Sequence, residues 1–157
     1  LLDTRKTLPG FRMLDKYAVA VGGGINHRMG LYDMVMIKDN HIEAAGSIRE
    51  AVERVRSCYG KRYTVEVEAS TLDEVKEAVE SGADIIMLDN MDNVLMHQST
   101  VVIGKKAKIE ISGNMDEGRI CSIKTLQVDY VSAGALTHTV RAFDLSMKFR
   151  REPDNQI

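Results

Sequence analysis

Short apolar segments alternate with amphipathic segments along most of this chain, and this alternation restricts its fold more than any other feature. Five apolar segments of five or six residues have the length and composition of buried strands. They cover residues 33–38, 63–68, 84–89, 107–112 and 128–132. Amphipathic helices are expected between them, over residues 42–59, 71–82, 94–103 and 116–125. Repeated strand–helix units predict an α/β fold with a parallel sheet covered on both faces.

The strand count leaves the closure of this sheet open. The sheet is either an open doubly wound sheet or a barrel, and five predicted strands are too few for a complete eight-stranded barrel. No Pro-, Gly- or Ser-rich linker divides the chain, so residues 1–157 are predicted to form one domain. Because the sequence starts at Leu1 and not at Met, we expect a partial domain that is incomplete at its front.

Composition and charge exclude several classes of partner. The formal net charge is −2 and the sequence pI is about 6.1, so neither nucleic acid nor an anionic membrane is expected as a partner. No apolar run approaches the roughly 20 residues that cross a bilayer, and the first residues lack the pattern of a signal peptide. Cys58 and Cys121 lack metal-ligand spacing, so we expect reduced thiols in a cytoplasmic protein, although a disulfide stays open.

Polar residues recur where the predicted strands end. Lys38, Glu68, Asp89 and Ser112 each close an apolar strand, and Gly134 follows the last one. In parallel α/β folds the carboxyl ends of the strands form the mouth of the ligand site. Each residue alone could simply meet solvent, but the repetition from strand to strand favours a binding site.

Two glycine-containing turns, residues 112–114 and 133–135, open the last two strand–helix connections. Glycine lets the backbone approach a phosphate closely, so the pair indicates a phosphomonoester site, with His138 close to the second turn. Ordinary turns that use glycine for its backbone freedom are the alternative.

Cationic residues precede the regular alternation. Arg5, Lys6, His27 and Arg28 suit a dicarboxylate ligand, because arginine pairs with carboxylates in bidentate fashion. A solvated basic loop is the alternative, and we prefer it for Arg12, Arg49, Arg54, Arg56 and Arg62.

For the glycine run at residues 22–24 and for His41 and His97, we expect structural and not ligand-binding roles. Residues 22–24 are three glycines without the spacing of a dinucleotide loop, and they indicate a tight turn beside His27. His41 is interpreted as a neighbour of a helix cap and His97 as a surface residue.

Six sequence blocks, taken together, resemble the motifs of quinolinate phosphoribosyltransferases. They are, in this order, TRKTLPGFR, VGGGINHRMGLYDMVMIKDNHI, VEVEASTLDEV, IIMLDN, IEISGN and VSAGALTH, and the match as a whole runs from Thr4 to about Phe149. The resemblance implies an incomplete, TIM-like parallel α/β barrel without the N-terminal α+β domain of the family. It also implies transfer of phosphoribose from phosphoribosyl pyrophosphate to quinolinate. Decarboxylation then gives nicotinate mononucleotide, CO2 and pyrophosphate, a step of NAD biosynthesis.

The resemblance also implies residue roles. Arg5, His27 and Arg28 match the residues that hold the quinolinate carboxylates, and Lys6 and Lys38 match lysines that reach toward the pyrophosphoryl donor. Thr4 belongs to the same substrate-binding motif. Glu68 and Asp89 match an acidic pair near the ribose hydroxyls and the Mg²⁺–pyrophosphate, so Lys38, Glu68 and Asp89 are the expected catalytic residues. The expected cradle of the 5-phosphate is Ser112, Gly113, Asn114, Ala133, Gly134 and Ala135, with His138 beside it.

The same resemblance implies a homodimer or a higher homo-oligomer, in which the N-terminal domain supplies an arginine to the partner's site.

Three alternative functions stay open. One is a paralogue that serves molybdenum transport or another heteroaromatic acid. Another is a phosphate-binding module without catalysis. The third is a Schiff-base aldolase that uses Lys38.

Overall fold

The computed structural model describes residues 1–150, and its centre is a curved sheet of five parallel strands. The strands follow one another in sequence order: β1 (Val35–Ile37), β2 (Val65–Ala69), β3 (Ile85–Asp89), β4 (Lys108–Ser112) and β5 (Tyr130–Val131). The helices are α1 (Arg12–Val21), α2 (Asp39–Ala45), α3 (Ile48–Tyr59), α4 (Leu72–Glu80), α5 (Asn93–Ile103), α6 (Glu117–Ser122) and α7 (Ala135–His138). The α/β class predicted from the sequence is therefore confirmed.

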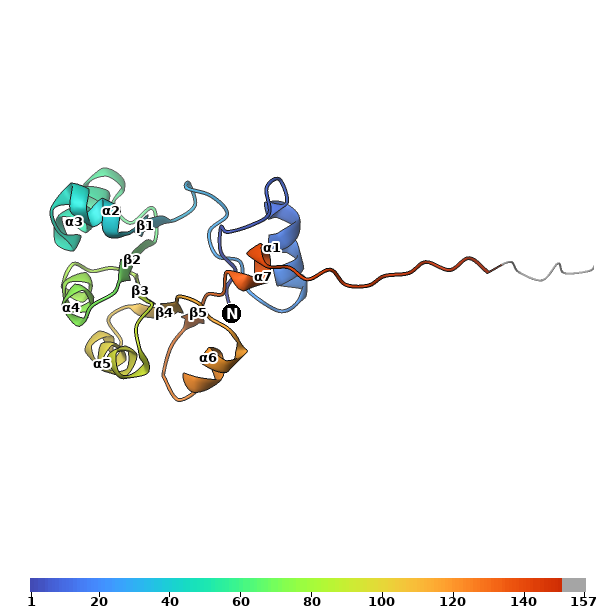
Figure 1. Ribbon diagram of the computed structural model, residues 1–157. Coiled ribbons are helices and arrows are strands. Elements are labelled where there is room, and N and C mark those ends of the chain that lie inside the picture. Colours follow the sequence, from blue (N-terminus) through green and yellow to red (C-terminus); the bar gives the residue numbers. More distant parts are fainter. Residues whose placement is uncertain (151–157) are drawn as a thin grey trace, which may run out of the picture.

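Helices α2 to α6 lie outside the curve of the sheet, whereas α1 and α7 lie together past its β5 end (Figure 1). This arrangement follows from the two-residue period of the strands. Val65 and Val67 of β2 join the hydrophobic core under the helices, as do the equivalent residues of β3 and β4. The intervening residues, among them Glu66, Glu68 and Glu110, face the inner side of the curve. The inner face is therefore polar, and the core lies between sheet and helices.

The front of the chain extends this sheet, which the sequence did not predict. Leu2 pairs in parallel with Ser132 and with Ile25, so two further short segments continue the curve past β5. The Leu2 N–H donates to the Val131 carbonyl at 2.8 Å, and the Ala133 N–H donates to the Leu2 carbonyl at 3.0 Å. The curvature and this continuation agree with the barrel-like sheet that the family resemblance implies.

Two helix predictions need correction. The single helix expected over residues 42–59 is two helices, because Gly46 takes a left-handed φ of 105° and Ser47 caps a new helix by accepting the Glu50 N–H. Helix α1 was not predicted at all. By contrast, the capping box expected at the start of α4 is present, with Thr71 and Glu74 bonded reciprocally.

Within the described residues, the helices are all too short or too polar to traverse a bilayer.

Candidate active site

Two adjoining pockets open on the inner face, around the carboxyl ends of the strands. The first, here called the cationic pocket, encloses about 300 Å³ and is lined by Thr4, Arg5, Lys6, His27, Arg28, Met36 and Lys38. The second, here called the strand-end pocket, encloses about 420 Å³. It is lined by Thr4, Lys6, Glu68, Asp89, Asn90, Ser112, Gly113, Asn114, Met115, Asp116, Ser132, Gly134, Ala135 and His138. Because Thr4 and Lys6 line both, a ligand group in one pocket lies close to a ligand group in the other.

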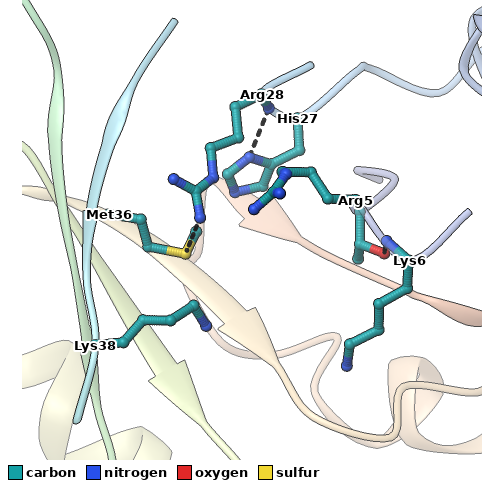
Figure 2. A pocket seen from close by; sticks show the side chains of 7 residues that line it. Arg5, Lys6, His27, Arg28, Met36 and Lys38 are labelled. Atoms are coloured by element: carbon teal, nitrogen blue, oxygen red, sulfur yellow. Dashed lines mark hydrogen bonds between the residues drawn. The ribbon is translucent and has the colours of Figure 1, made fainter. Parts of the chain in front are cut away.

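The cationic pocket gathers like charges, and among the described residues its two arginines form no ion pair with a carboxylate. Figure 2 shows the guanidinium groups of Arg5 and Arg28 beside the His27 ring, with Lys6 and Lys38 below them. The Arg5 Nε is buried and has no hydrogen-bond partner among the described residues. Burial lowers the pKa of Arg28, and the charge of Arg5 lowers it further. Such mutual repulsion is relieved when an anion enters, so the pocket is suited to a ligand with two carboxylates.

His27 lines the floor of this pocket, and two buried glutamates lie against its ring. Its Nε2 lies 3.2 Å from Glu66 Oε2 and 3.5 Å from Glu110 Oε2, and both glutamates are almost fully buried. Burial favours the neutral form of His27, but hydrogen bonding and attraction to Glu110 and Glu66 outweigh it and raise the pKa of His27 to about 9. Burial also raises the pKa of Glu66.

The orientation of the His27 ring is also fixed by a backbone group. Its Nδ1 accepts the Arg28 N–H at 2.7 Å, so the proton that His27 retains lies on the Nε2 side, toward Glu66 and Glu110.

Lys38 and Glu68 link the two pockets. Lys38 follows β1 and Glu68 lies at the end of β2, and their side chains form an ion pair. Lys38 remains 40% exposed, so its ammonium group can still contact a ligand. On the next strand, Asp89 Oδ2 accepts a hydrogen bond from the Asn90 amide at 2.7 Å. The carboxylates of two neighbouring strands thus stand at the same edge.

Backbone geometry shapes the far wall of the strand-end pocket. Asn90 and Asn114 adopt left-handed φ values of 51° and 49°, and the Asn114 amide donates to Asn90 Oδ1 at 3.3 Å. Gly113 has a φ of 102°, and a Cβ there would overlap the Asn90 side chain. Only glycine therefore fits at this turn, and its bare backbone faces the pocket.

The second predicted turn is fixed by close packing. A Cβ on Gly134 would lie 2.9 Å from the His138 Cδ2 and 3.6 Å from the Lys6 Cδ. The Thr137 hydroxyl donates to the Lys6 carbonyl at 2.7 Å, which holds Lys6 against this turn. An imidazole and an ammonium group consequently flank Gly134, an arrangement suited to a phosphate.

The structure brings the predicted site residues together, with one exception. All of them line one of the two pockets except Ala133, which lines neither. Ala133 is buried and its N–H pairs with Leu2, so it serves the sheet. The sequence reasoning missed Glu66 and Glu110, although each stands two residues before a predicted site residue in its strand, at the same parity as Glu68 and Ser112. That two-residue period was the available signal.

The structural interpretations are mostly confirmed. His41 accepts the Lys38 N–H at the start of α2, His97 is exposed, and Gly23 turns the chain with a φ of 88°. The prediction that Arg12 lies in a solvated loop is wrong. Arg12 is partly buried and donates to Thr7, to the Met29 carbonyl and to the Arg5 carbonyl.

The same prediction is wrong for Arg56, which donates hydrogen bonds to Asp84 at 2.7 Å and to the Tyr63 carbonyl at 3.1 Å. Arg49, Arg54 and Arg62 are exposed, as expected. Cys58 and Cys121 are free and exposed.

Comparison with known proteins identifies the family. Residues 1–148 match the family model described as "Quinolinate phosphoribosyl transferase, C-terminal domain". A probable nicotinate-nucleotide pyrophosphorylase (carboxylating) of Bacillus subtilis is 46% identical, over 94% of this chain and 51% of that protein. The chloroplastic enzyme of the same name from Arabidopsis thaliana is 45% identical, over 97% of this chain and 49% of that protein.

The fold agrees with these sequence matches. The crystal structure of NadC from Streptococcus pyogenes superposes with a TM-score of 0.91 and 47% sequence identity, covering 94% of this chain and 52% of that one. The nicotinate-nucleotide pyrophosphorylase of Francisella tularensis gives a TM-score of 0.88 at 46% identity. The chain spans about half the length of the curated relatives that it matches. It belongs to the quinolinate phosphoribosyl transferase family and corresponds to the C-terminal domain of that family.

Proposed function

We propose that this chain carries the catalytic site of a carboxylating nicotinate-nucleotide pyrophosphorylase, which transfers phosphoribose from phosphoribosyl pyrophosphate to quinolinate. The observation that carries the proposal is the junction of the two pockets through Thr4 and Lys6. One pocket is built for two carboxylates, and the other offers two carboxylates and two close-packed turns. A heteroaromatic diacid and a phosphorylated sugar would therefore meet at their boundary.

In the cationic pocket, Arg5 and Arg28 would pair with the carboxylates of quinolinate. The unmet hydrogen-bonding capacity of the buried Arg5 Nε and the repulsion between the two guanidinium groups support this role. His27, held from below by Glu66 and Glu110, would donate from the pocket floor only if its protonated nitrogen turned away from those glutamates. We therefore assign His27 mainly to shaping the floor, beside the two arginines.

In the strand-end pocket, Glu68 and Asp89 would face the ribose. As the pyridine nitrogen forms its bond to the anomeric carbon, the bond from that carbon to pyrophosphate breaks and the ring gains positive charge. Nearby carboxylates stabilise such charge. Lys38 and Lys6 would neutralise the departing pyrophosphate. The substrate then loses CO2, the electron pair stays on the ring carbon beside the nitrogen, and this carbon takes up a proton to give nicotinate mononucleotide.

Mg²⁺ is the cofactor that we propose. Glu68 and Asp89 supply the hard oxygen ligands that this ion prefers, and they stand at neighbouring strand ends. Two carboxylates are too few for a complete coordination shell, which fits an ion that takes its other ligands from pyrophosphate and water. When bound, Mg²⁺ would neutralise charge on the leaving pyrophosphate.

Features of the two pockets also argue against the three alternative functions. A Schiff-base aldolase needs a lysine with a free amine, whereas Lys38 forms an ion pair with Glu68. A module that only binds phosphate would not need the two neighbouring arginines of the cationic pocket. A paralogue for another heteroaromatic acid is disfavoured because the pocket offers cations for both carboxylates.

We further propose a cytoplasmic location and a homodimeric or larger assembly. The free, exposed Cys58 and Cys121 fit a reducing compartment. The outward face of α1, with Met13, Leu14 and Tyr17 exposed, supports an apolar surface that is covered in an assembly.

The decisive experiment is a pyrophosphate-release assay on the full gene product with phosphoribosyl pyrophosphate, Mg²⁺ and quinolinate. We expect release that depends on quinolinate, and formation of nicotinate mononucleotide. Nicotinate, which lacks one carboxylate, serves as the control and should not support release. Binding of phosphoribosyl pyrophosphate without any turnover would contradict the proposal and favour the binding module. Trapping of a carbonyl substrate by borohydride would favour the aldolase.

A further inference from the structure

Lys16 is the one side chain of α1 that is buried, and it is fully buried. A lysine in this position is unusual, because removing its ammonium group from water is costly unless a partner compensates. The partner is Asp3, which is also fully buried and forms an ion pair with it. The apolar residues Met13, Leu14 and Tyr17 of the same helix are exposed. The buried position of α1 is therefore occupied by a charged side chain and not by an apolar one.

Both members of this ion pair are bonded to the backbone of one site residue. The Lys16 ammonium donates to the His27 carbonyl at 2.9 Å, and Asp3 Oδ1 accepts the His27 N–H at 2.8 Å. With its amide nitrogen facing Asp3, Asn26 adds a bond of 2.7 Å to Asp3 Oδ2 and one of 2.8 Å to the Lys16 carbonyl. The peptide groups on both sides of His27 are thus held by the pair.

The constraint continues into the cationic pocket. The His27 ring meets Glu66 and Glu110, and its Nδ1 accepts the N–H of Arg28, the next residue. Among the described residues, the Arg28 guanidinium group contacts two weak acceptors, the Met34 carbonyl at 3.5 Å and the Met36 sulfur at 3.3 Å. The position of its guanidinium group therefore depends on the backbone that precedes it.

We infer that Asp3 and Lys16 are positioning residues for the cationic pocket. Neither lines that pocket, yet together they fix both peptide groups of His27 and thereby the point from which His27 and Arg28 reach the ligand. This inference rests on the proposed function, because its readout is quinolinate affinity. The pair bonds to the His27 backbone and not to the turns of the strand-end pocket, which are held by other contacts such as Thr137 to Lys6, so its main effect is expected on the quinolinate side.

The test is the double variant Asp3→Asn/Lys16→Met in the full gene product. Replacing both charges avoids leaving one of them buried and unpaired, so the fold is expected to survive. The methionine removes the donor to the His27 carbonyl. We expect the KM for quinolinate to rise about ten- to a hundredfold, because small misplacements of binding groups have effects of this size. The KM for phosphoribosyl pyrophosphate should stay within about twofold.

A matched control is Arg49→Met/Glu80→Gln, which removes an exposed ion pair on α3 and α4 that touches neither pocket. Both KM values should be unchanged in this control. If the double variant at Asp3 and Lys16 is folded and its quinolinate KM equals that of the parent, the pair serves the fold alone and the inference is wrong. An equal rise in both KM values would also overturn it, because it indicates general damage.

Should the methionine variant not fold, Asp3→Asn/Lys16→Gln provides the same comparison. Its glutamine keeps a hydrogen-bonding group but is shorter than lysine, so it cannot hold the His27 carbonyl in the same place. The same selective rise in quinolinate KM is expected, and its absence would again contradict the inference. Failure of the proposed function is recognised separately, because the unmodified protein would then release no pyrophosphate with quinolinate.

Discussion

Alkaline pH should destabilise this fold through a single buried histidine. Burial acts to lower the pKa of His27, but Glu110 and Glu66 raise it from 6.5 to about 9. The folded protein therefore keeps a proton that the unfolded chain releases near pH 6.5. The stability that this proton contributes is complete below pH 6.5 and is lost as the pH rises through about 9.

The size of the effect follows from the difference between the two pKa values. One pKa unit corresponds to about 1.4 kcal/mol, so the shift from 6.5 to about 9 is worth roughly 3 kcal/mol. Solvent screens it little, because the His27 side chain is only 7% exposed and the two carboxylates are at most 1% exposed. This is a sizeable part of the roughly 5–15 kcal/mol that stabilises an ordinary domain.

Urea unfolding of the purified protein, repeated between about pH 6 and pH 10, measures this dependence. The variant Glu110→Gln removes the stronger of the two groups that raise the His27 pKa and leaves the opposing effect of burial in place, so the loss of unfolding free energy in this range should shrink by more than half. Glu80→Gln changes an exposed carboxylate far from His27 and is the matched control. An identical pH dependence in the parent and in Glu110→Gln would refute the assignment of the titration to His27.

Three further predictions concern the substrates, and all are checked in the full gene product. Arg28→Ala and Arg5→Ala should each weaken quinolinate binding by about 2–5 kcal/mol by calorimetry, because each removes a bidentate partner from a desolvated site; unchanged binding would remove that arginine from the carboxylate site. Asp89→Asn should lower kcat more than quinolinate affinity, because its charge acts on the cationic transition state; the reverse pattern in steady-state kinetics would exchange the roles. Gly134→Ala should weaken the binding of phosphoribosyl pyrophosphate in titrations but not the binding of quinolinate, because the added methyl would meet the His138 ring. An unchanged affinity for phosphoribosyl pyrophosphate would place its phosphate elsewhere.

The strand ends were predictable because they depend on local pattern. Lys38, Glu68, Asp89 and Ser112 each terminate an apolar run, and the parallel order of the strands brings such ends to one edge. The roles of these residues stay proposals until the experiments above are done. What the sequence shows directly is their placement.

The parts that were missed depend on contacts between distant segments. Lys16 lies in a stretch whose apolar residues face outward, so the period of α1 gave no core-facing stripe to detect. Leu2 pairs with Ser132, which lies 130 positions later in the chain, and no local sequence pattern indicates such a pairing. Glu66 and Glu110 were hidden in apolar strands because their partner, His27, comes from a separate segment.

The alternation of the strands has a consequence for where this chain tolerates a change in length. Deleting Val65 from β2 would turn Glu66 and Glu68 toward the hydrophobic core and bring Val67 to the ligand side. Core and site would be lost in the same event. The connections at the opposite ends of the strands are under no such constraint. Gly104, Lys105 and Lys106 are exposed and line neither the cationic pocket nor the strand-end pocket, so an epitope tag or a few extra residues can be inserted there without shifting any strand.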